Sequence, residues 1–513
     1  MYTIFSKLLV ALATFLPLTF VTAIPPTLKR TPNDYTPLSP SPSIIQQELG
    51  LCLSKNASLY FPSSPKFQNY TLRWSAAMDP DFAVVVVPAA DREVSCTVKF
   101  ATKYNVPFLT VNQAHGTASA LSNVYNGIEI YVSALNSIDI ALDGNSALMG
   151  GGTYQDQVVT YLAAHGKTAS TGACGCVGMM GPGLGGGFGR YQGYFGLVLD
   201  NIISMNVVLA NGSMVTVSAS SNPDLYWGMR GAGHNFGIVT SFNYKIHDQP
   251  VVDWFVETMI FTADKLEAFF EKLNALGANG TQPVGLFTYT LFAMSPEISK
   301  TEPVIIFTLE YAGTKAQAEP LYTPFLTLNP VVTTNVTVPY TGVAHASGAG
   351  VEDPLCAKGD SWKTFPVGLQ VYNIATNRAI YNIYSKMISE NPEFNNSVVQ
   401  FEAYSMQAVK AVDPASTAYA HRADNLLVSF ATVYPANHTL DAIADTYGKQ
   451  ARGVLHAGDA PGRPLNTYVN YASTDETPEQ MYGYEPWRLA KLRALKKKYD
   501  PNGRFNFYAP VNP

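Results

Sequence analysis

The feature that most constrains this chain is a glycine-rich run, Thr171-Gly-Ala-Cys-Gly-Cys-Val-Gly-Met-Met-Gly-Pro-Gly-Leu-Gly-Gly-Gly-Phe-Gly189. Its nine glycines leave long stretches of main chain without side chains. A large planar or anionic ligand can approach such a backbone closely and accept hydrogen bonds from its N–H groups. Composition alone also fits a flexible surface loop, so the segments around the run must decide between the two.

Two common motifs come close to this run without matching it. Three of its glycines satisfy G-x-G-x-x-G, and Asp200 lies near the spacing of a ribose-binding acid. Pro182 and the extra glycines would disrupt the helix that this motif opens, and no apolar strand leads into the run. A structural zinc site would need a second pair of ligands beside Cys174 and Cys176, and the sequence offers none. We expect neither a Rossmann fold nor a metal site.

The segment before the run has an α/β pattern. Residues 82–88 form a continuous β-branched run typical of a strand buried on both faces, and residues 106–111 resemble a second strand. Between them, Asp91 is expected to cap a helix with apolar residues at helical spacing. Together they make a βαβ unit. His115 follows the second strand, where α/β proteins place ligand sites, although a lone histidine there is often structural.

The rest of the chain alternates strands and helices. Asn211-Gly212 between residues 205–210 and 213–218 predicts a β-hairpin. Residues 250–464 read as an α+β region, with a helix expected over 263–276. A further helix over 486–498 should end at Asp500-Pro-Asn-Gly503, because proline and glycine terminate helices.

The N-terminus has the pattern of a secretory signal over residues 1–23. Lys7 precedes an apolar stretch, and small residues allow cleavage after Ala23. The stretch is too short for a membrane anchor, and no later one is long and apolar enough. Residues 24–44 are expected to form a loose leader, in which Lys29-Arg30 offers a second processing site. The net charge of −5 does not favour a nucleic-acid partner.

Secretion is consistent with the sequons and cysteines. Seven Asn-x-Ser/Thr sequons predict a glycosylated surface: Asn56, Asn69, Asn211, Asn279, Asn335, Asn395 and Asn437. Five cysteines are an odd number, so at least one stays unpaired within the chain. We expect one disulfide, between Cys52 and Cys96, which leaves Cys174, Cys176 and Cys356 to be explained otherwise.

Four blocks of the sequence resemble berberine-bridge-enzyme-type FAD-linked oxidases, within the vanillyl-alcohol-oxidase-like flavoproteins. They are residues 106–116, residues 174–201, residues 224–240, and Tyr468-Val-Asn-Tyr471 followed by 498–505. The resemblance covers nearly all of the mature chain and implies a two-domain α+β fold of the PCMH type. It implies an FAD-binding domain over 45–250, with a core at about 78–248, completed by residues 465–513. A substrate domain over 251–464, sheet plus helices, would pack over the flavin.

The resemblance also implies FAD held by two covalent bonds. His115 stands where the family histidine joins the flavin 8-methyl group, and Cys174 where the family cysteine joins flavin C6; Cys176 is a rival with the wrong spacing to Val177-Gly178. Cysteine and imidazole are suitable nucleophiles for such bonds. The FAD-binding residues implied are His115, Gly116, Cys174, Val177, Gly178, Gly183, Leu184, Gly185, Gly186, Gly187, Gly237, Ile238, Val239, Asn470 and Tyr471.

Two departures from the family pattern matter. Asn112-Gln-Ala-His115 replaces Arg-x-Gly-Gly-His, so pyrophosphate contacts at this loop are in doubt. The strand expected near residues 427–430 lacks the polar or acidic base of the plant enzymes. The candidate bases are therefore Tyr468, Tyr471 and Glu402, with Tyr468 weakly favoured, although a tyrosine in this motif more often packs or contacts flavin.

The resemblance implies a function as well. Val177 is a small residue at the point where the family leaves room for dioxygen, which favours an oxidase that releases hydrogen peroxide. The chain looks most similar to fungal oxidases of secondary metabolism, acting on a small alcohol or a ring-closure precursor. The alternatives are an oligosaccharide oxidase acting at the anomeric carbon, and a redox-inactive flavin-containing binding protein. We expect a monomer whose partners are a small-molecule substrate and dioxygen.

Overall fold

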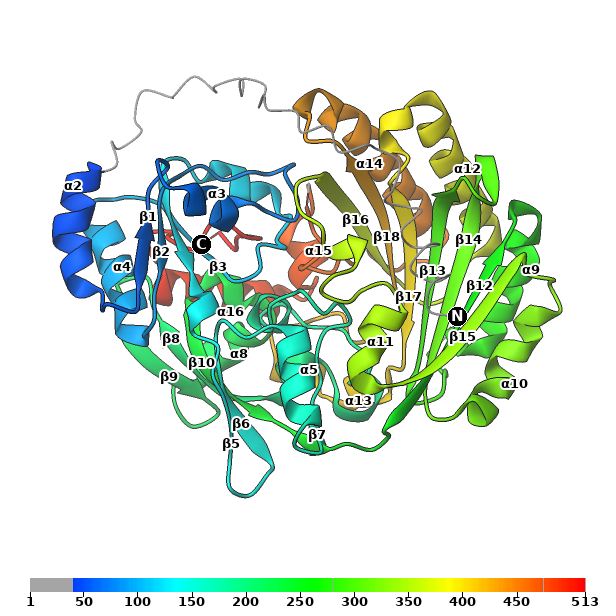
Figure 1. The fold of residues 1–513 in the computed structure, drawn as a ribbon, viewed down its shortest axis with the longest axis horizontal. Helices are drawn as coiled ribbons and strands as arrows, with labels where there is room; N and C mark the ends of the chain where they lie inside the picture. The colour runs from blue at the N-terminus through cyan, green and yellow to red at the C-terminus, as the bar shows by residue number, and fades with distance from the viewer. Residues whose placement is uncertain (1–39, 279, 474, 513) are drawn as a thin grey trace.

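The computed structural model describes residues 40–278, 280–473 and 475–512. The chain forms two lobes, of which the first contains a four-stranded and a five-stranded sheet and the second a seven-stranded sheet. Figure 1 shows the first lobe on the left in blue, cyan and bluish green and the second on the right in green, yellow and orange, with the red C-terminal helix returning to the first lobe. The expected signal and Lys29-Arg30 lie outside the described residues.

The four-stranded sheet confirms the predicted βαβ unit. Its strand order is β1 (Ser58–Tyr60), β2 (Phe82–Val87), β4 (Gly127–Tyr131) and β3 (Phe108–Val111), with β2, β4 and β3 parallel. The connecting helix is α4 (Asp91–Lys103).

The cap of α4 was predicted wrongly. Asp91 lies inside the first turn, and the carboxylate of Glu93 accepts the N–H groups of Ala89 and Ala90 at 2.6 Å and 3.2 Å. Glu93 therefore reaches back to the start of the helix, because its longer side chain spans the first turn.

The five-stranded sheet contains the predicted hairpin. Gly212 at its turn has φ = 77°, a left-handed conformation that glycine adopts without steric cost. The hairpin strands begin and end a few residues earlier than expected on the first side. The antiparallel order is β5 (Ile138–Ile140), β6 (Ser146–Gly150), β10 (Ile238–Lys245), β8 (Ile202–Val208) and β9 (Met214–Ser218).

The C-terminal segment packs into the first lobe. Helix α16 (Pro486–Tyr499) matches its predicted position, and its Lys496 forms a fully buried ion pair with Asp500 at 2.6 Å. Lys496 also donates to the backbone oxygen of Asn235, whose side chain accepts from Val511 N–H at 2.7 Å. These bonds join the C-terminal segment to the middle of the first lobe.

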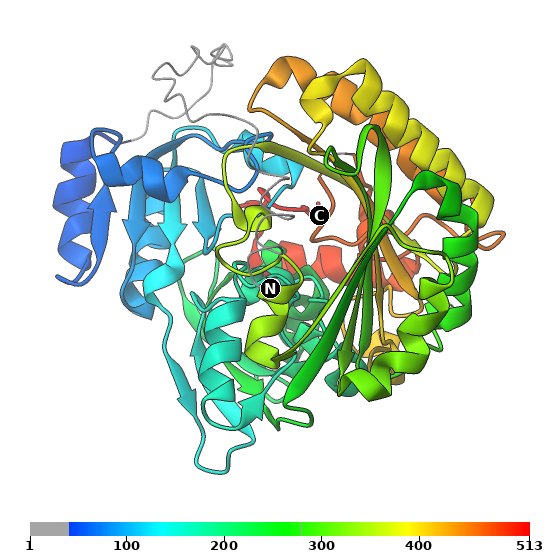
Figure 2. The ribbon, with the colours of Figure 1, turned by 45° about the vertical axis from the view of Figure 1, so that its right-hand side comes forward.

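The second lobe is a seven-stranded antiparallel sheet covered by helices on one face. Figure 2 shows α9 (Leu266–Leu273), α10 (Lys315–Leu326), α12 (Ile374–Glu390) and α14 (Asp441–Ala457) on its outer side. The helix expected over 263–276 is confirmed as three consecutive helical segments: a 3₁₀ turn at Ala263–Lys265, α9, and a π-helical turn at Asn274–Ala278, in which Gly277 takes φ = 108°. The strand order is β15 (Val332–Pro339), β12 (Asp253–Phe261), β14 (Ser299–Ala312), β13 (Leu286–Ser295), β17 (Val398–Tyr404), β18 (Leu426–Tyr434) and β16 (Ser361–Leu369).

Short elements complete the fold. The last residues of the expected loose leader are helical and form α2 (Pro42–Ile44). This helix continues into a π-helical turn at Ile45–Leu49, which packs against the first sheet. The short helices and strands are α2 (Pro42–Ile44), α3 (Pro65–Thr71), α5 (Gln155–Ala163), α6 (Met180–Gly183), α7 (Gln192–Phe195), α8 (Pro223–Ala232), α11 (Tyr340–Ala346), α13 (Gln407–Ala411), α15 (Pro478–Tyr482), β7 (Lys167–Thr168) and β11 (His247–Asp248).

The disulfides differ from the expectation in number. Cys52–Cys96 is confirmed, but Cys176 and Cys356 form a second disulfide, so the expectation of one bridge was wrong. Cys176 lies in the glycine-rich run and Cys356 just before β16, and the bridge therefore links the two lobes. Cys174 is the one free cysteine of the described chain.

No helix in the described part of the chain has the length and apolar character to cross a membrane. Asn279 lies outside the described residues. The other six sequon asparagines are all exposed: Asn56, Asn69, Asn211, Asn335, Asn395 and Asn437.

Candidate functional site

A cavity of about 410 Å³ lies where the two lobes meet. This volume is within the usual range for small-molecule and cofactor sites. Its walls come from the glycine-rich run, the loop after β3, the C-terminal segment and the inner face of the seven-stranded sheet. Thirteen residues predicted from the sequence line it: His115, Gly116, Cys174, Val177, Gly178, Leu184, Gly237, Ile238, Val239, Glu402, Tyr468, Asn470 and Tyr471.

Four predicted glycines lie behind the wall instead. Gly183, Gly185, Gly186 and Gly187 are not among the lining residues. A Cβ at Gly185 would lie 2.2 Å from the side chain of Asn470, and one at Gly187 2.4 Å from Val198. These glycines therefore allow close packing of protein on protein, which supports the lining residues in front of them.

The first proposed attachment point follows β3 directly. Ala114 takes φ = 61°, so the chain turns there through a conformation that normally favours glycine, and His115 enters the cavity. The imidazole stacks on Trp74, with ring centroids 5.4 Å apart. Burial, reinforced by Lys358 and Arg73, lowers the pKa of His115 to about 3. The imidazole is therefore neutral at physiological pH and can act as a nucleophile.

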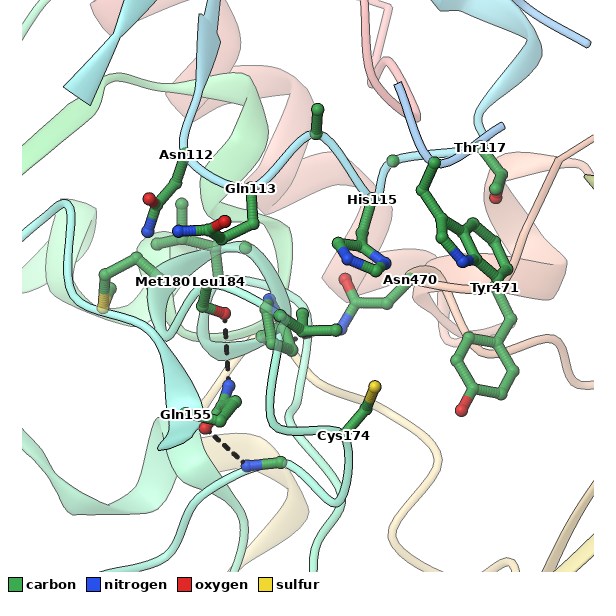
Figure 3. Close-up of a pocket in the computed structure, with 18 of the residues that line it drawn as sticks. Asn112, Gln113, His115, Thr117, Gln155, Cys174, Met180, Leu184, Asn470 and Tyr471 are labelled. Atoms are coloured by element: carbon green, nitrogen blue, oxygen red, sulfur yellow. Dashed lines mark hydrogen bonds between the residues drawn. The ribbon is translucent and has the colours of Figure 1, made fainter. Parts of the chain in front are cut away.

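The second proposed attachment point, Cys174, lies on a loop that is held by a network of hydrogen bonds. Gln155, buried at the start of α5, accepts from Gly172 N–H at 2.8 Å and donates to the backbone oxygen of Gly178 at 3.1 Å. Arg190 donates to the backbone oxygen of Ala173 at 2.6 Å. Figure 3 shows the result: Cys174 and His115 face the same space from opposite sides.

The thiol of Cys174 is protonated at rest. Burial raises its pKa to about 11, with a smaller opposing effect from a backbone hydrogen bond at Cys176. A thiol is a weaker nucleophile than a thiolate, so bond formation at Cys174 requires removal of this proton.

The cavity residues fit a ligand with both planar and anionic parts. Buried polar atoms without a protein partner include Asn112 Oδ1, His234 Nδ1 and Asn470 Oδ1, and all three residues line the cavity. Arg73, a buried cation in the same wall, has Nε and Nη1 unpartnered. A Cβ placed on Gly181 would meet no atom within 4 Å. Donors, acceptors, a buried cation and bare backbone are what a dinucleotide requires.

The substrate-lobe wall carries a buried carboxyl group. Glu402 lies on β17 and accepts hydrogen bonds from Tyr471 at 3.0 Å and from Tyr404 at 2.6 Å. Burial raises the pKa of Glu402 to about 7, although both tyrosines oppose this shift. A carboxyl group with a pKa near neutrality is suited to accept a proton from a substrate.

Tyr468 has a different environment from the other two candidate bases. Its hydroxyl accepts from Gly187 N–H at 2.9 Å and bonds Asn470 at 2.7 Å. Burial raises the pKa of Tyr468, which makes its ionised form rarer still. The geometry thus ties Tyr468 to the glycine-rich run, whereas Tyr471 is hydrogen-bonded to Glu402.

Sequence reasoning missed several residues of the site. Arg190 and Glu310 both line the cavity and form a buried ion pair. They are 120 residues apart in the sequence, so no local pattern predicts this pair. Gln155 is a polar residue at a helix start, which by itself is unremarkable. The alternation of Gln400, Glu402 and Tyr404 with apolar residues did mark one face of a strand.

Comparisons with known proteins agree with this site. Residues 82–218 match the family model of an FAD binding domain, and residues 467–512 match that of berberine and berberine-like proteins. The FAD-linked oxidoreductase anuG of Penicillium roqueforti is 44% identical over 472 residues, 92% of each chain. The FAD-linked oxidoreductase chyH of Penicillium rubens is 40% identical over 469 residues, 91% of this chain and 93% of its own.

Solved structures share the fold at lower identity. Physcomitrella patens BBE-like 1 superposes with a TM-score of 0.77 at 23% identity, over 91% of this chain and 99% of that one. A chitooligosaccharide oxidase superposes with a TM-score of 0.76 at 22% identity, with the same coverage. Fold and cavity thus define a two-domain FAD-binding oxidoreductase of mixed α+β structure. The chain belongs to the berberine-bridge-enzyme-like family of FAD-linked oxidoreductases.

Proposed function

We propose that this FAD-linked oxidoreductase carries FAD on two covalent bonds, to His115 and Cys174, and oxidises a small organic molecule. The observation that carries the proposal is that both side chains point into one cavity from opposite walls. FAD, when bound, supplies the two-electron acceptor that takes a hydride from the substrate and passes the electrons to dioxygen, giving hydrogen peroxide. Two attachments keep the cofactor in place outside the cell.

Glu402 and Tyr471 supply the proton acceptor in this proposal. Tyr471 donates to Glu402 at 3.0 Å, so a substrate hydroxyl that binds Tyr471 can pass its proton along this bond to the carboxylate. Tyr404 holds the other oxygen of Glu402 at 2.6 Å and fixes its orientation. Removal of the hydroxyl proton as the hydride leaves would convert an alcohol to a carbonyl compound.

The substrate proposed is a small alcohol or a ring-closure precursor of fungal secondary metabolism. The substrate-side lining is rich in aromatic rings, among them Phe287, Tyr289 and Trp362, which suit a planar or apolar molecule. Relatives at about 40% identity bear the name FAD-linked oxidoreductase, whereas the sugar-oxidising neighbours share only the fold. A panel of aromatic alcohols, polyketides and oligosaccharides, assayed for peroxide, separates the two classes. Turnover on oligosaccharides alone would overturn the substrate proposal.

The covalent linkage is tested directly by mass. We expect acid precipitation of the purified protein to leave the yellow colour in the pellet, and digestion to give flavin on both the His115 and the Cys174 peptides. His115→Ala should retain flavin through Cys174, and Cys174→Ala through His115. Flavin in the supernatant would show that the linkage is absent. A variant that loses no bond would show that the wrong residue was assigned.

Use of dioxygen and secretion form part of the same proposal. Val177 lines the cavity with a small side chain, which supports access of dioxygen. Two disulfides and six exposed sequons support secretion and glycosylation, and the protein is proposed to be a monomer. Aerobic turnover without an added acceptor tests the first point, and activity with quinones alone would contradict it. A mass shift on deglycosylation of protein from the culture medium, and its mass by light scattering, test the others.

A further inference from the structure

Three sulfur atoms meet beside the cavity, where the glycine-rich run contacts the segment before β16. Cys176 and Cys356 are disulfide-bonded, and the free Sγ of Cys174 lies 3.5 Å from the first sulfur and 3.8 Å from the second. The sulfurs all lie within 4.8 Å of one another. A soft metal would need several thiolates, but the disulfide leaves only Cys174 able to supply one.

The main chain keeps these side chains together. Gly175 N–H donates to the backbone oxygen of Ala349 at 2.8 Å, and the oxygen of Gly175 accepts from Asp156 N–H at 3.0 Å. The first bond joins the Cys174 loop to the loop that leads to Cys356. With sulfur separations of 3.5 Å and 3.8 Å, each neighbour of Cys174 is close enough to be an alternative disulfide partner.

We propose that the Cys176–Cys356 disulfide keeps Cys174 as a free thiol. Because Cys176 and Cys356 are bonded to each other, neither can form a disulfide with Cys174. The inference rests on the proposed function, in which Cys174 carries flavin. Attachment replaces the S–H of Cys174 and one flavin ring C–H by a C–S bond. The two protons and two electrons released reduce dioxygen to hydrogen peroxide. A Cys174 already held in a disulfide has no S–H and cannot form this bond.

The native disulfide is also protected from exchange with its neighbour. Exchange proceeds by attack of a thiolate on one sulfur, along the line of the bond that breaks. Cys174 Sγ is almost equally distant from both sulfurs, so it lies beside the bond rather than in line with it. Its raised pKa further limits the thiolate. The thiol and the disulfide therefore coexist until FAD binds.

Serine substitutions test this protection, because removal of one protecting cysteine frees the other. In Cys356→Ser, Cys174 and Cys176 become neighbouring thiols. Glutathione disulfide takes two hydrogens from them, giving a Cys174–Cys176 disulfide and two glutathione thiols. Cys176→Ser leads in the same way to a Cys174–Cys356 disulfide. We expect both single variants to lose flavin from the Cys174 peptide while His115 keeps its flavin.

The double variant Cys176→Ser/Cys356→Ser distinguishes protection from simple tethering of the lobes. It lacks the same bridge as the single variants, but Cys174 has no partner left, so the flavin on its peptide should return. Replacement of both Cys52 and Cys96 by serine is the matched control. It removes the other disulfide and should leave the flavin on Cys174 unchanged. All proteins are produced in a secretory host and mapped by mass without reduction.

The outcomes separate the inference from the proposed function. Loss of Cys174 flavin in the double variant as well, or its retention in both single variants, would overturn the protection. If wild-type Cys174 carries no flavin, the proposed attachment fails, and alkylation of the denatured proteins decides the inference alone. In that case the protection of Cys174 predicts a free thiol at Cys174 in the wild type and in the double variant, and no free thiol there in the single variants.

Discussion

The two walls of the cavity are encoded in different ways. The FAD-side wall comes from contiguous runs, the loop after β3 and the glycine-rich segment, in which neighbouring residues act together. The substrate-side wall comes largely from alternate residues of β13 and β17, which are neighbours in the sheet but lie far apart in sequence, together with Glu310 of β14. A contiguous wall leaves a motif in the sequence, whereas a wall made across a sheet leaves only isolated polar positions among apolar ones.

Of the substitutions that test this difference between the two walls, the largest effect on catalysis is expected at Glu402, the carboxyl proposed as base on the substrate side. Glu402→Gln should lower kcat/KM by about 10²–10⁴-fold, because the amide cannot accept the substrate proton. Flavin content should stay unchanged, since the FAD-side wall is untouched. Steady-state kinetics and the flavin absorbance measure both.

Glu257→Gln is the matched control for this variant. Glu257 is a buried carboxyl on β12 of the same sheet, burial likewise raises its pKa to about 7, and it does not line the cavity. Its substitution should leave kcat/KM nearly intact. Equal losses in the two variants would mean that the sheet, rather than the base, had been damaged.

The pH profile gives the next largest effect. With the pKa of Glu402 raised to about 7, the carboxyl is protonated below neutrality and cannot act as a base. We expect kcat/KM to fall about tenfold per pH unit below pH 7 and to level above it. Glu402→Gln should lose this limb of the profile, and a limb that persists in the variant would assign it to another group.

The same carboxyl should make the protein less stable as the pH rises, whereas kcat/KM increases. The pKa of Glu402 is higher in the folded than in the unfolded protein, so the folded state binds the proton more tightly. Its contribution is present below the unfolded pKa of about 4.5 and is lost as pH rises through about 7. Between pH 4.5 and 7, the free energy of unfolding, measured by chemical denaturation, should therefore fall less steeply with rising pH in Glu402→Gln than in the wild type.

A smaller effect is expected on the FAD-side wall, at the support of the Cys174 loop. Gln155→Leu keeps the size of the side chain but leaves Gly172 N–H and the oxygen of Gly178 without their partners. The free energy of unfolding should fall by about 2 kcal/mol, the usual cost of unpaired buried groups. Flavin on Cys174 should decrease while flavin on His115 persists.

Gln157→Leu is the control for the loop support. Gln157 lies two residues further along α5 and donates to Asn136 O at an exposed position. Its substitution should change neither the stability nor the flavin content by much. Similar losses in both variants would indicate that α5 as a whole, rather than the bonds of Gln155, had been affected.

The same contrast explains how much the sequence predicts. The βαβ unit and the hairpin at Asn211-Gly212 come from local patterns that the fold preserves. The lining residues His115 and Cys174 come from the family resemblance, which contiguous blocks of the sequence carry. The Arg190–Glu310 ion pair depends on contact between the lobes, which no local pattern contains. The second disulfide was missed for the same reason, because its partners are 180 positions apart.

The smallest effect concerns the His115 loop, where Ala114 replaces a family glycine at φ = 61°. Ala114→Gly should relieve about 1–2 kcal/mol of left-handed strain. It should also lose about 1 kcal/mol of buried methyl contact and about 0.5–1 kcal/mol through the greater freedom of the unfolded chain. The net change in the free energy of unfolding should thus stay within about 1 kcal/mol of zero.

Ala101→Gly provides the reference for this balance, since Ala101 is equally buried but lies inside helix α4. There the substitution relieves no strain, and the loss should reach about 2 kcal/mol from helix propensity and methyl contact together. Denaturant unfolding of the two variants measures the difference. If Ala114→Gly destabilises the protein as much as Ala101→Gly, the turn before His115 stores no strain. The departure from the family glycine would then have no consequence for the backbone.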